Sequence, residues 1–482
     1  MLFLGPIWLS ILIPIAFALL LLAVSLVVRY MGYGALDKAV LLSAAALAVA
    51  FVIGGAVFAL LIAALVFVLH HVALAIERAA DSRSRDAARG RLPARAWLAI
   101  AVSVSVATGA AISRSGALAG PWQRVSGLLV PFGVSYFAFH GISYSVDVYR
   151  RRIRAERSRS QLAVYLLLLP LIAGGPVAYE GVARQLARRS PSVSDYSYGV
   201  RRLLIGVWKV FVMAGLSGAQ ADAAFAMRPG GLSALAAWVG LIGAAMQMYY
   251  AFSGYSDMGI GLGRMVGIRL PENFRWPYVG ETVREFWLRW HIGLSAWFRE
   301  YADLSMDADH VPAPSVGRDA LVVLLCGAWY GLAWTSAVWG LSQAALIVAE
   351  RHGVEAVVKR LPPLLRHVYL LVIVMAGWVI LRSATLGGAM QFFKALAGLN
   401  ATPLRVQPTT SAALWLVLAA GAIGCAPLFP AIRRWTVAID ALIVSLLMMI
   451  FASVLFAWRC CRIVVTPLLR GWRWSLTRAG RL

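Results

Sequence analysis

The chain has 482 residues, of which 61% are hydrophobic and only 14% are charged. Soluble domains average about 45–50% apolar and 25% charged residues, so this composition excludes a soluble globular protein and predicts a polytopic membrane protein. The formal net charge of +24 comes nearly entirely from arginines in short loops between apolar segments. Membrane topology explains that placement, and we therefore expect no nucleic-acid partner.

A transmembrane helix needs about 20 apolar residues, and the sequence contains about eleven such segments. The first runs from Leu2 to Val28 and is too long for a signal peptide, so we expect it to be retained as a helix. The predicted spans are 3–28, 37–53, 55–76, 96–113, 126–148, 199–220, 231–253, 318–347, 367–383, 411–429 and 437–457.

Three arginine-rich loops, at 78–95, 150–159 and 184–202, are expected to face the cytoplasm, because basic loops resist translocation. Counting spans from these loops places the N-terminus outside. Between the second and third loops lies "LLLLPLIAGGPVAYEG" (166–181), which is short and broken by glycine and proline. We expect it to enter the membrane and return on the same side. Irregular backbone at membrane depth must be buried in protein or line a cavity, so the segment predicts a pocket wall.

The stretch "FSGYSDMGIGLGRMVGIRLPENFRWPY" (252–278) follows the span at 231–253 and is rich in glycine, proline and charge. It is too polar to be expected to cross the membrane, and its composition is not that of a linker. Its ionisable and amide side chains include Asp257, Arg264 and Asn273, which become candidate site residues.

The next stretch, "EFWLRWHIGLSAWFREY" (285–301), is predicted to be one helix with a polar and an aromatic face. Its polar stripe holds Arg284, His291, Ser295 and Arg299, and Glu285 and Arg289 are spaced to form an ion pair. An interfacial helix anchored by tryptophan and arginine is one interpretation. His291 favours the other, a functional cavity, because ionisable groups at membrane depth are costly and usually functional.

These stretches resemble a known family. The segments at 253–274 and 286–301 are similar to the membrane-bound O-acyltransferases of the branch that includes alginate O-acetylases and the D-alanyl transfer protein of teichoic acids. "VPFGVSYFAFHGISYSVDVYR" (130–150), "PLIAGGPV" (170–177) and "GWVILRSATLGGAMQFFKALAG" (377–398) match further family segments in the same order. The likeness covers about 130–400 and is weak in the first 125 residues.

The resemblance implies an all-α polytopic fold of about eleven transmembrane helices with re-entrant segments around a central funnel. It divides the chain into N-terminal transmembrane helices (1–125), a family-like core (126–400) and C-terminal helices with a basic tail (401–482). It also implies that an acyl group from a cytoplasmic donor passes toward an acceptor on the other side of the membrane.

The sequence departs from the family at one site. The family's principal histidine belongs to a Trp-His-Gly step, whereas "CGAWYGLAWTSAVWGLSQA" (326–344) has Tyr330 in that place and Gln343 where a second histidine is common. The loop at 302–319 also lacks the family's Tyr-Ile-Pro-Leu-Gly-Gly stretch. A phenol, with a pKa of about 10, is a poor general base near pH 7, but it can donate a hydrogen bond to a developing oxyanion.

His291 is then the family-motif histidine that remains, and we assign it to substrate positioning and, with Tyr330, to catalysis. His140 could substitute as a base, although a packed core histidine is the commoner case. The expected substrate path is lined by Asp257, Arg264, Asn273, Arg289, Trp290, Trp329, Gln343 and His140. The four cysteines show no metal-ligand spacing, and we expect no metal and no bound cofactor.

Two functions remain open, together with a weaker third. The first is an O-acyltransferase of the bacterial inner membrane that uses acetyl-CoA or an acyl carrier as thioester donor and an exported polysaccharide as acceptor, with membrane lipid and a periplasmic partner. The second is a non-enzymatic subunit of a polysaccharide modification or export complex, in which the lost histidine marks lost chemistry. A transporter is disfavoured because no paired intramembrane carboxylates are evident.

Overall fold

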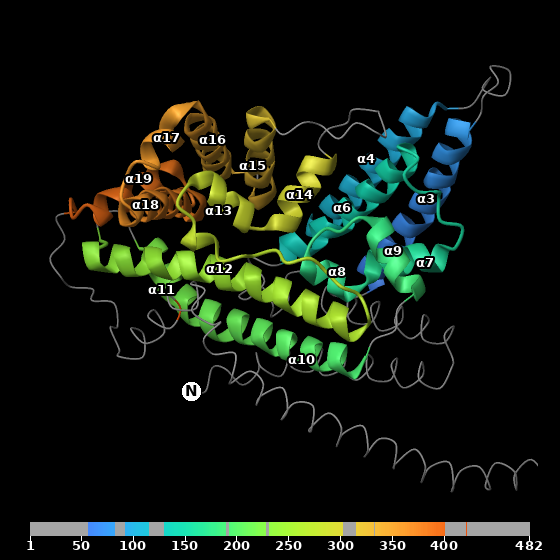
Figure 1. The fold of residues 1–482 in the computed structure, drawn as a ribbon, viewed down its shortest axis with the longest axis horizontal. Helices are drawn as coiled ribbons and strands as arrows, with labels where there is room; N and C mark the ends of the chain where they lie inside the picture. Colours follow the sequence, from blue (N-terminus) through green and yellow to red (C-terminus); the bar gives the residue numbers. More distant parts are fainter. Residues whose placement is uncertain are drawn as a thin grey trace, which may run out of the picture.

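The computed structural model describes residues 56–81, 92–114, 130–188, 192–227, 231–301, 315–331, 333–400 and 421 (Figure 1). Of these residues 81% are helical, and none of them forms a strand. The all-α prediction is thus confirmed for this part of the chain. The predicted spans at 3–28, 37–53, 411–429 and 437–457 lie outside the described residues, as do most of the first and last predicted domains.

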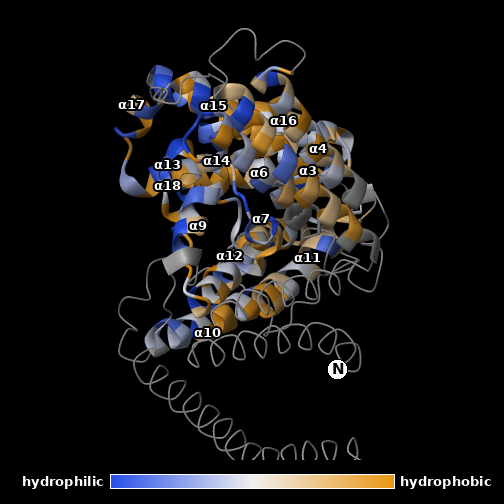
Figure 2. Cartoon of the chain, turned by 90° about the vertical axis from the view of Figure 1, so that its right-hand side faces the viewer, coloured by the Kyte–Doolittle hydropathy of each residue, from blue (hydrophilic) through white to orange (hydrophobic). Residues whose placement is uncertain are grey.

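Within the described ranges, four helical segments are long and apolar enough to cross a membrane: Leu60–Ala80, Ser194–Phe225, Ala234–Met265 and Pro363–Arg382. They correspond to four of the predicted spans. Helices α4 (Ala94–Arg114) and α6 (Val130–Tyr149) occupy two more. In Figure 2, apolar residues dominate α3 (Ala56–Asp81) and α4, whereas α9 (Tyr179–Arg188) is more hydrophilic. The chain is therefore a membrane protein.

Helix α12 (Ala234–Met265) forms the centre of the described fold, and it is longer than the predicted span at 231–253. The first part of the glycine-rich stretch, which the sequence analysis judged too polar to cross the membrane, continues this helix to Met265. Its glycines allow close contact with α10 (Val193–Trp208): a Cβ on Gly261 would lie 2.6 Å from the Gly199 carbonyl oxygen. Glycine serves helix packing here, as small residues do between membrane helices.

The helix that packs along α12 changes its winding midway. Helix α10 continues into a π-helical turn, η1 (Lys209–Ala214), and then into α11 (Gly215–Phe225). Figure 1 shows α10 and α11 following the same side of α12. Ser192 begins α10 with a capping box, in which its hydroxyl accepts from the Asp195 N–H.

The segment predicted to be re-entrant is a set of short, broken helices. Helix α7 (Arg159–Leu167) ends at Leu168, whose backbone is extended, and α8 (Leu169–Gly174) ends at Gly175, whose φ is 95°. The two ends of the excursion meet, because the Tyr179 hydroxyl at the start of α9 donates to Glu156 at 2.6 Å. Leu168 and Leu171 are buried. The chain thus leaves and returns at one place, with its irregular backbone covered by protein.

The contact between α8 and α12 depends on Gly259. A Cβ at this position would lie 2.6 Å from the Gly174 Cα and 2.8 Å from the Pro170 carbonyl oxygen. Because these atoms belong to backbone, we expect Gly259→Ala to cost about 1–3 kcal/mol of stability. Thermal unfolding in detergent measures it. The matched control is Gly181→Ala in α9, where a Cβ meets nothing within 4 Å; equal melting temperatures for the two variants would contradict the prediction.

Five further α-helices and a π-helical turn follow in the described part of the chain. After α14 (Ile292–Tyr301) come α15 (Val316–Tyr330) and α16 (Trp334–Ala349), which replace the single span predicted at 318–347. They pack against each other, and a Cβ on Gly327 would lie 2.9 Å from the Gly340 Cα. The chain turns back at Gly331, so Tyr330 lies at the bend. The π-helical turn η3 (Glu350–Val354), α17 (Glu355–Val358), α18 (Pro363–Arg382) and α19 (Leu386–Leu396) follow.

Candidate functional site

The stretch predicted as one amphipathic helix is broken at its histidine. Helix α13 (Val283–Arg289) ends before Trp290, and α14 (Ile292–Tyr301) begins after His291. The backbone of His291 is left-handed, with a φ of 47°, which is uncommon for a residue other than glycine. A backbone strained in this way is over-determined by its surroundings and often marks a functional site.

Asn273 helps to explain why the helix breaks there. Its side-chain oxygen accepts from the Gly293 N–H at 2.9 Å, and its carbonyl oxygen accepts from the Ile292 N–H at 2.9 Å. The first N–H groups of a helix need partners outside it, and Asn273 supplies them for α14. Its side-chain nitrogen also donates to Gly174 and to Ser256. Asn273 therefore ties the α8 end of the re-entrant segment to the start of α14.

Helix α13 is anchored at its own start by Glu350 of η3. The Glu350 carboxylate accepts from the N–H groups of Val283 and Arg284, at 2.8 and 3.0 Å. Burial raises the pKa of Glu350, and these two backbone donors oppose the rise. Glu285 was expected to form an ion pair with Arg289. Its carboxylate instead accepts from the Glu281 N–H at 3.0 Å. Both helices that flank His291 are therefore held at their N-terminal ends.

His291 is 4% exposed and lies among aromatic rings. The ring centroids of Phe252, Phe274 and Trp329 lie 5.9, 5.6 and 5.4 Å from that of the imidazole. The Nε2 atom is 3.3 Å from the Tyr136 hydroxyl of α6. The Nδ1 atom is buried and has no hydrogen-bond partner among the described residues. One ring nitrogen is thus held by protein, and the other is buried without a hydrogen-bond partner among the described residues.

Tyr330 shares two aromatic neighbours with this histidine. Its ring centroid is 5.6 Å from that of Phe252 and 5.2 Å from that of Trp329, the two rings that also contact His291. Trp290, next to His291 in the chain, donates from Nε1 to the Tyr330 hydroxyl at 2.9 Å. The structure therefore brings together four of the residues predicted for the site: His291, Tyr330, Trp290 and Trp329.

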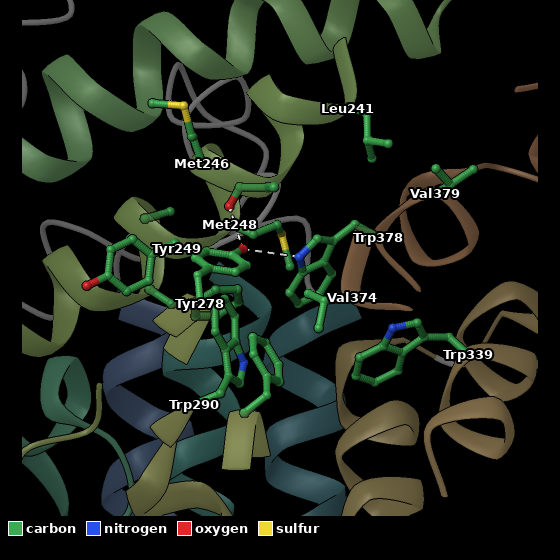
Figure 3. Close-up of a cluster of buried hydrophobic side chains, with 14 of the residues drawn as sticks. Leu241, Met246, Met248, Tyr249, Tyr278, Trp290, Trp339, Val374, Trp378 and Val379 are labelled. Atoms are coloured by element: carbon green, nitrogen blue, oxygen red, sulfur yellow. Dashed lines mark hydrogen bonds between the residues drawn. The ribbon is translucent and has the colours of Figure 1, made fainter. Parts of the chain in front are cut away.

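One of these four residues, Trp290, belongs to a larger cluster of buried side chains (Figure 3). Trp290 is fully buried, stacks on Phe286 at 5.3 Å and lies 5.2 Å from Trp378. The Trp378 Nε1 donates to the Tyr278 hydroxyl at 3.1 Å, which donates to the Ala245 carbonyl oxygen at 2.9 Å. Each such ring pair contributes about 0.5–1.5 kcal/mol beyond its buried area. The cluster joins α12, α13 and α18 into a rigid support for the site.

Gln343 belongs to this support. It is 3% exposed, and its side-chain oxygen accepts from the Trp287 Nε1 at 3.4 Å. Its amide nitrogen lies beside Gly377 of α18. Gln343 therefore contacts α13 and α18, and its predicted place on the substrate path is not supported by a contact with His291 or Tyr330.

Asp257 and Arg264 of α12 face α10 and η1. Asp257 forms ion pairs with Arg202 at 2.6 Å and Lys209 at 2.7 Å, and Arg264 pairs with Asp195 at 2.8 Å. Phe252, on the same helix, faces His291. Asp257 follows five residues later, and five residues of α-helix turn the direction of a side chain by about 140°, so Asp257 faces elsewhere. These two charged residues thus fasten α12 to α10 and η1, and the structure does not bring them to the His291 cluster.

Arg289 and His140 complete the predicted set. Arg289 is the half-buried last residue of α13, and its carbonyl oxygen accepts from the Arg275 N–H at 3.0 Å. His140 is fully buried on α6, where its Nε2 accepts from the Val177 N–H at 3.4 Å. Its ring lies 5.0 Å from Tyr165 of α7. His140 holds the re-entrant segment against α6, which agrees with the interpretation of a packed histidine.

Two residues of the cluster were not singled out by the sequence. Tyr136 lies one helical turn before His140, and Phe252 opens the glycine-rich stretch. Both look like ordinary aromatic residues of apolar helices. The partner of Tyr136 is 155 positions away, and no local pattern reports a pair at that distance.

The chain was compared with known proteins. No protein-family model matches it. It is 36% identical over 276 residues to a probable alginate O-acetylase from Azotobacter vinelandii, covering 56% of this chain and 54% of that protein. A peptidoglycan O-acetyltransferase from Helicobacter pylori is 27% identical over 309 residues, 58% of each chain. A teichoic acid D-alanyltransferase from Bacillus subtilis is 26% identical over 243 residues, which cover 47% of this chain and 60% of that protein.

These names agree with the branch that the sequence motifs resemble, while the replacement of the family's histidine by Tyr330 stays a prediction. The chain spans about half the length of the alginate O-acetylases that it matches. Over slightly more than half of its own length, this membrane chain is therefore similar in sequence to bacterial acyltransferases named for alginate, peptidoglycan and teichoic acid.

Proposed function

We propose that this chain is a membrane-bound O-acyltransferase that moves an acetyl or similar acyl group from a cytoplasmic thioester donor toward an exported polysaccharide. The observation that carries the proposal is the shared aromatic surroundings of His291, which is buried, and Tyr330, which is partly buried: both have Phe252 and Trp329 as neighbours. Similarity to O-acetylases over 276 residues supports the acyl chemistry.

In the proposed reaction, His291 accepts the proton of an acceptor hydroxyl as that oxygen attacks the thioester carbonyl carbon. The new C–O bond forms, the C–S bond breaks, and the proton passes to the departing thiolate. Tyr330 donates a hydrogen bond to the carbonyl oxygen while negative charge develops there. The Trp290 N–H, which donates to the Tyr330 oxygen, polarises the phenol and makes it a stronger donor.

The donor is proposed to be acetyl-CoA or an acyl carrier used as a co-substrate, with no resident cofactor. The acceptor class follows from the relatives, whose names specify alginate and peptidoglycan. A periplasmic acyl-transfer or polysaccharide-modifying protein is the proposed partner, and the bacterial inner membrane is the proposed location. Arg157 pairs with Glu77 at 2.7 Å, so two of the arginine-rich loops lie on one face, which we assign to the cytoplasm.

The second candidate function is a subunit of a polysaccharide modification or export complex that no longer transfers acyl groups. The observation that favours it is the packing of Tyr330 and Gln343, which accept from the tryptophans at the end of α13 and within it and so stabilise the fold. A residue that serves only packing there needs no substrate.

Replacement of Tyr330 separates the two functions. Tyr330→Phe keeps the ring contacts and removes the hydroxyl, so we expect the ester-linked acyl content of the exported polysaccharide to fall about 10²-fold, the typical cost of one oxyanion donor. The esters are released by mild base from cells with the gene, without it and with the variant. Tyr196→Phe of α10, which is half-buried and outside the cluster, is the matched control.

Loss of ester in the deletion strain alone, with full ester in Tyr330→Phe, removes Tyr330 from the chemistry and is the result that a non-catalytic subunit of a modification complex predicts. Unchanged ester in all strains contradicts polysaccharide acylation and favours the non-catalytic subunit.

A further inference from the structure

We infer that Tyr136 is a positioning residue of the reaction: its hydroxyl holds the His291 imidazole in the form protonated at Nε2, so that Nδ1 is the base that meets the acceptor hydroxyl. This inference rests on the proposed function. It assigns a role to a residue that neither the sequence motifs nor the similarity to known acyltransferases identifies.

The first support is the contact itself. The Tyr136 hydroxyl lies 3.3 Å from the His291 Nε2, and both side chains are at most 5% exposed. The Tyr136 ring also stacks on Trp329 at 6.0 Å, and Trp329 contacts both His291 and Tyr330. Tyr136 is thus locked by its ring while its hydroxyl faces the histidine.

The second support is the other nitrogen of the ring. The His291 Nδ1 is buried and has no hydrogen-bond partner among the described residues. If Tyr136 donated to Nε2, the neutral ring would carry a buried N–H at Nδ1, fixed in the ring plane, with no acceptor among the described residues. If Nε2 donates to Tyr136, Nδ1 keeps a lone pair instead, and the hydrogen without an acceptor there is that of the Tyr136 hydroxyl, which can turn about its C–O bond. That lone pair is what a general base requires.

The third support is the way in which α6 and α14 fix this contact. The two helices run side by side in the same direction, with Tyr136 against His291 at one end and the Tyr301 hydroxyl donating to Asp147 at 3.0 Å at the other. Between these ends, the Phe139 ring lies 4.4 Å from that of Trp297. Bonds at both ends and rings between them prevent α14 from sliding along α6.

During the reaction the arrangement needs no rearrangement of the ring. Nδ1 takes the hydroxyl proton, and the resulting imidazolium still donates from Nε2 to the Tyr136 oxygen. When the proton passes to the thiolate, the ring returns to its starting form. Tyr136 therefore keeps one role, that of acceptor, in both charge states of His291.

The test uses the full-length protein in bilayers, labelled with ¹⁵N-histidine, and reads the protonation of each ring nitrogen by solid-state NMR. The chain has seven histidines, and the signals that disappear in His291→Asn identify His291. We expect the parent ring to be protonated at Nε2, and Tyr136→Phe to give a mixture of both forms. A parent ring protonated at Nδ1, or an unchanged spectrum in Tyr136→Phe, overturns the inference.

Kinetics supply the second readout. Tyr136→Phe is expected to lower kcat for acyl transfer about tenfold with KM unchanged, the effect of losing one neutral hydrogen bond. Phe139→Leu is the matched control, because it loosens the same α6–α14 packing and leaves the Tyr136 hydroxyl in place. Equal losses of kcat in the two variants indicate a structural role and overturn the inference. If no variant and no parent protein transfers acyl groups, the proposed function fails, while the NMR result still decides the state of His291.

Discussion

His291→Asn is expected to lower acyl transfer by about 10² to 10⁴, the range for loss of a general base. Asparagine is the informative replacement because the backbone at 291 has a φ of 47°, and asparagine tolerates this left-handed conformation better than most residues. The amide has no basic nitrogen to take the hydroxyl proton. Ester-linked acyl content and transfer by purified protein in liposomes both measure the effect.

The folded yield of His291→Asn should stay near that of the parent, since the break between α13 and α14 is held by Asn273 and Glu350. His352→Asn, the same change at an exposed histidine of η3, is expected to leave transfer unchanged. Full activity of His291→Asn would contradict the assignment of the base, whereas loss of folded protein would show that position 291 is structural.

Asp257→Asn is expected to give the largest loss of stability, about 3 kcal/mol, because it leaves Lys209 without its carboxylate partner and Arg202 with Glu272 alone. Asp257 is 4% exposed and pairs with both Arg202 and Lys209. The amide keeps the shape of the side chain and removes only its charge. The unfolding temperature of the purified protein in detergent measures this loss.

Asp222→Asn provides the matched control for the same chemical change. Asp222 pairs with Arg382, and its side chain is 67% exposed, so solvent screens the pair and we expect about 0–1 kcal/mol. Similar unfolding temperatures for the two variants would mean that the Asp257 cluster adds little to the packing of α12 on α10. A large loss of transfer with an unchanged unfolding temperature would instead return Asp257 to the substrate path.

The general class of the fold and part of the site followed from patterns that are local in the sequence. Apolar length predicts helices such as α3 and α18, because the bilayer demands about 20 apolar residues whatever their partners are. The proline and glycines around Pro170 signal broken backbone in the same direct way. His291 could be singled out because a histidine among apolar residues is costly at membrane depth.

Breaks without such signals could not be predicted. Trp290 and His291 interrupt the helix although neither residue is a helix breaker, because Asn273 supplies partners for the N–H groups at the start of α14. The bend after Tyr330 contains only one glycine, Gly331, within a long apolar run. Hydropathy averages over such a bend and reports a single span.

Contacts between residues far apart in the sequence could not be predicted either. Asp257 and Arg264 were assigned to the substrate path because charge in an apolar chain suggests function. Their partners Arg202 and Asp195 lie 55 and 69 positions away, and helical packing alone decides that they meet. Tyr136 could not be identified from the sequence for the same reason: its role depends on His291, which lies in another third of the chain.

The π-helical turn at Lys209–Ala214 determines which side of α11 faces α12. Gly206 and Gly218 both face α12, and in a regular α-helix the twelve steps between them would turn Gly218 away by about 120°. One extra residue in a π turn absorbs about 100° of that rotation. The turn therefore restores the direction of the glycine face, so that one side of this 32-residue helical segment stays in contact with α12. Removing a single residue there would shorten the helix while preserving its face, whereas adding one would rotate the whole of α11 out of contact.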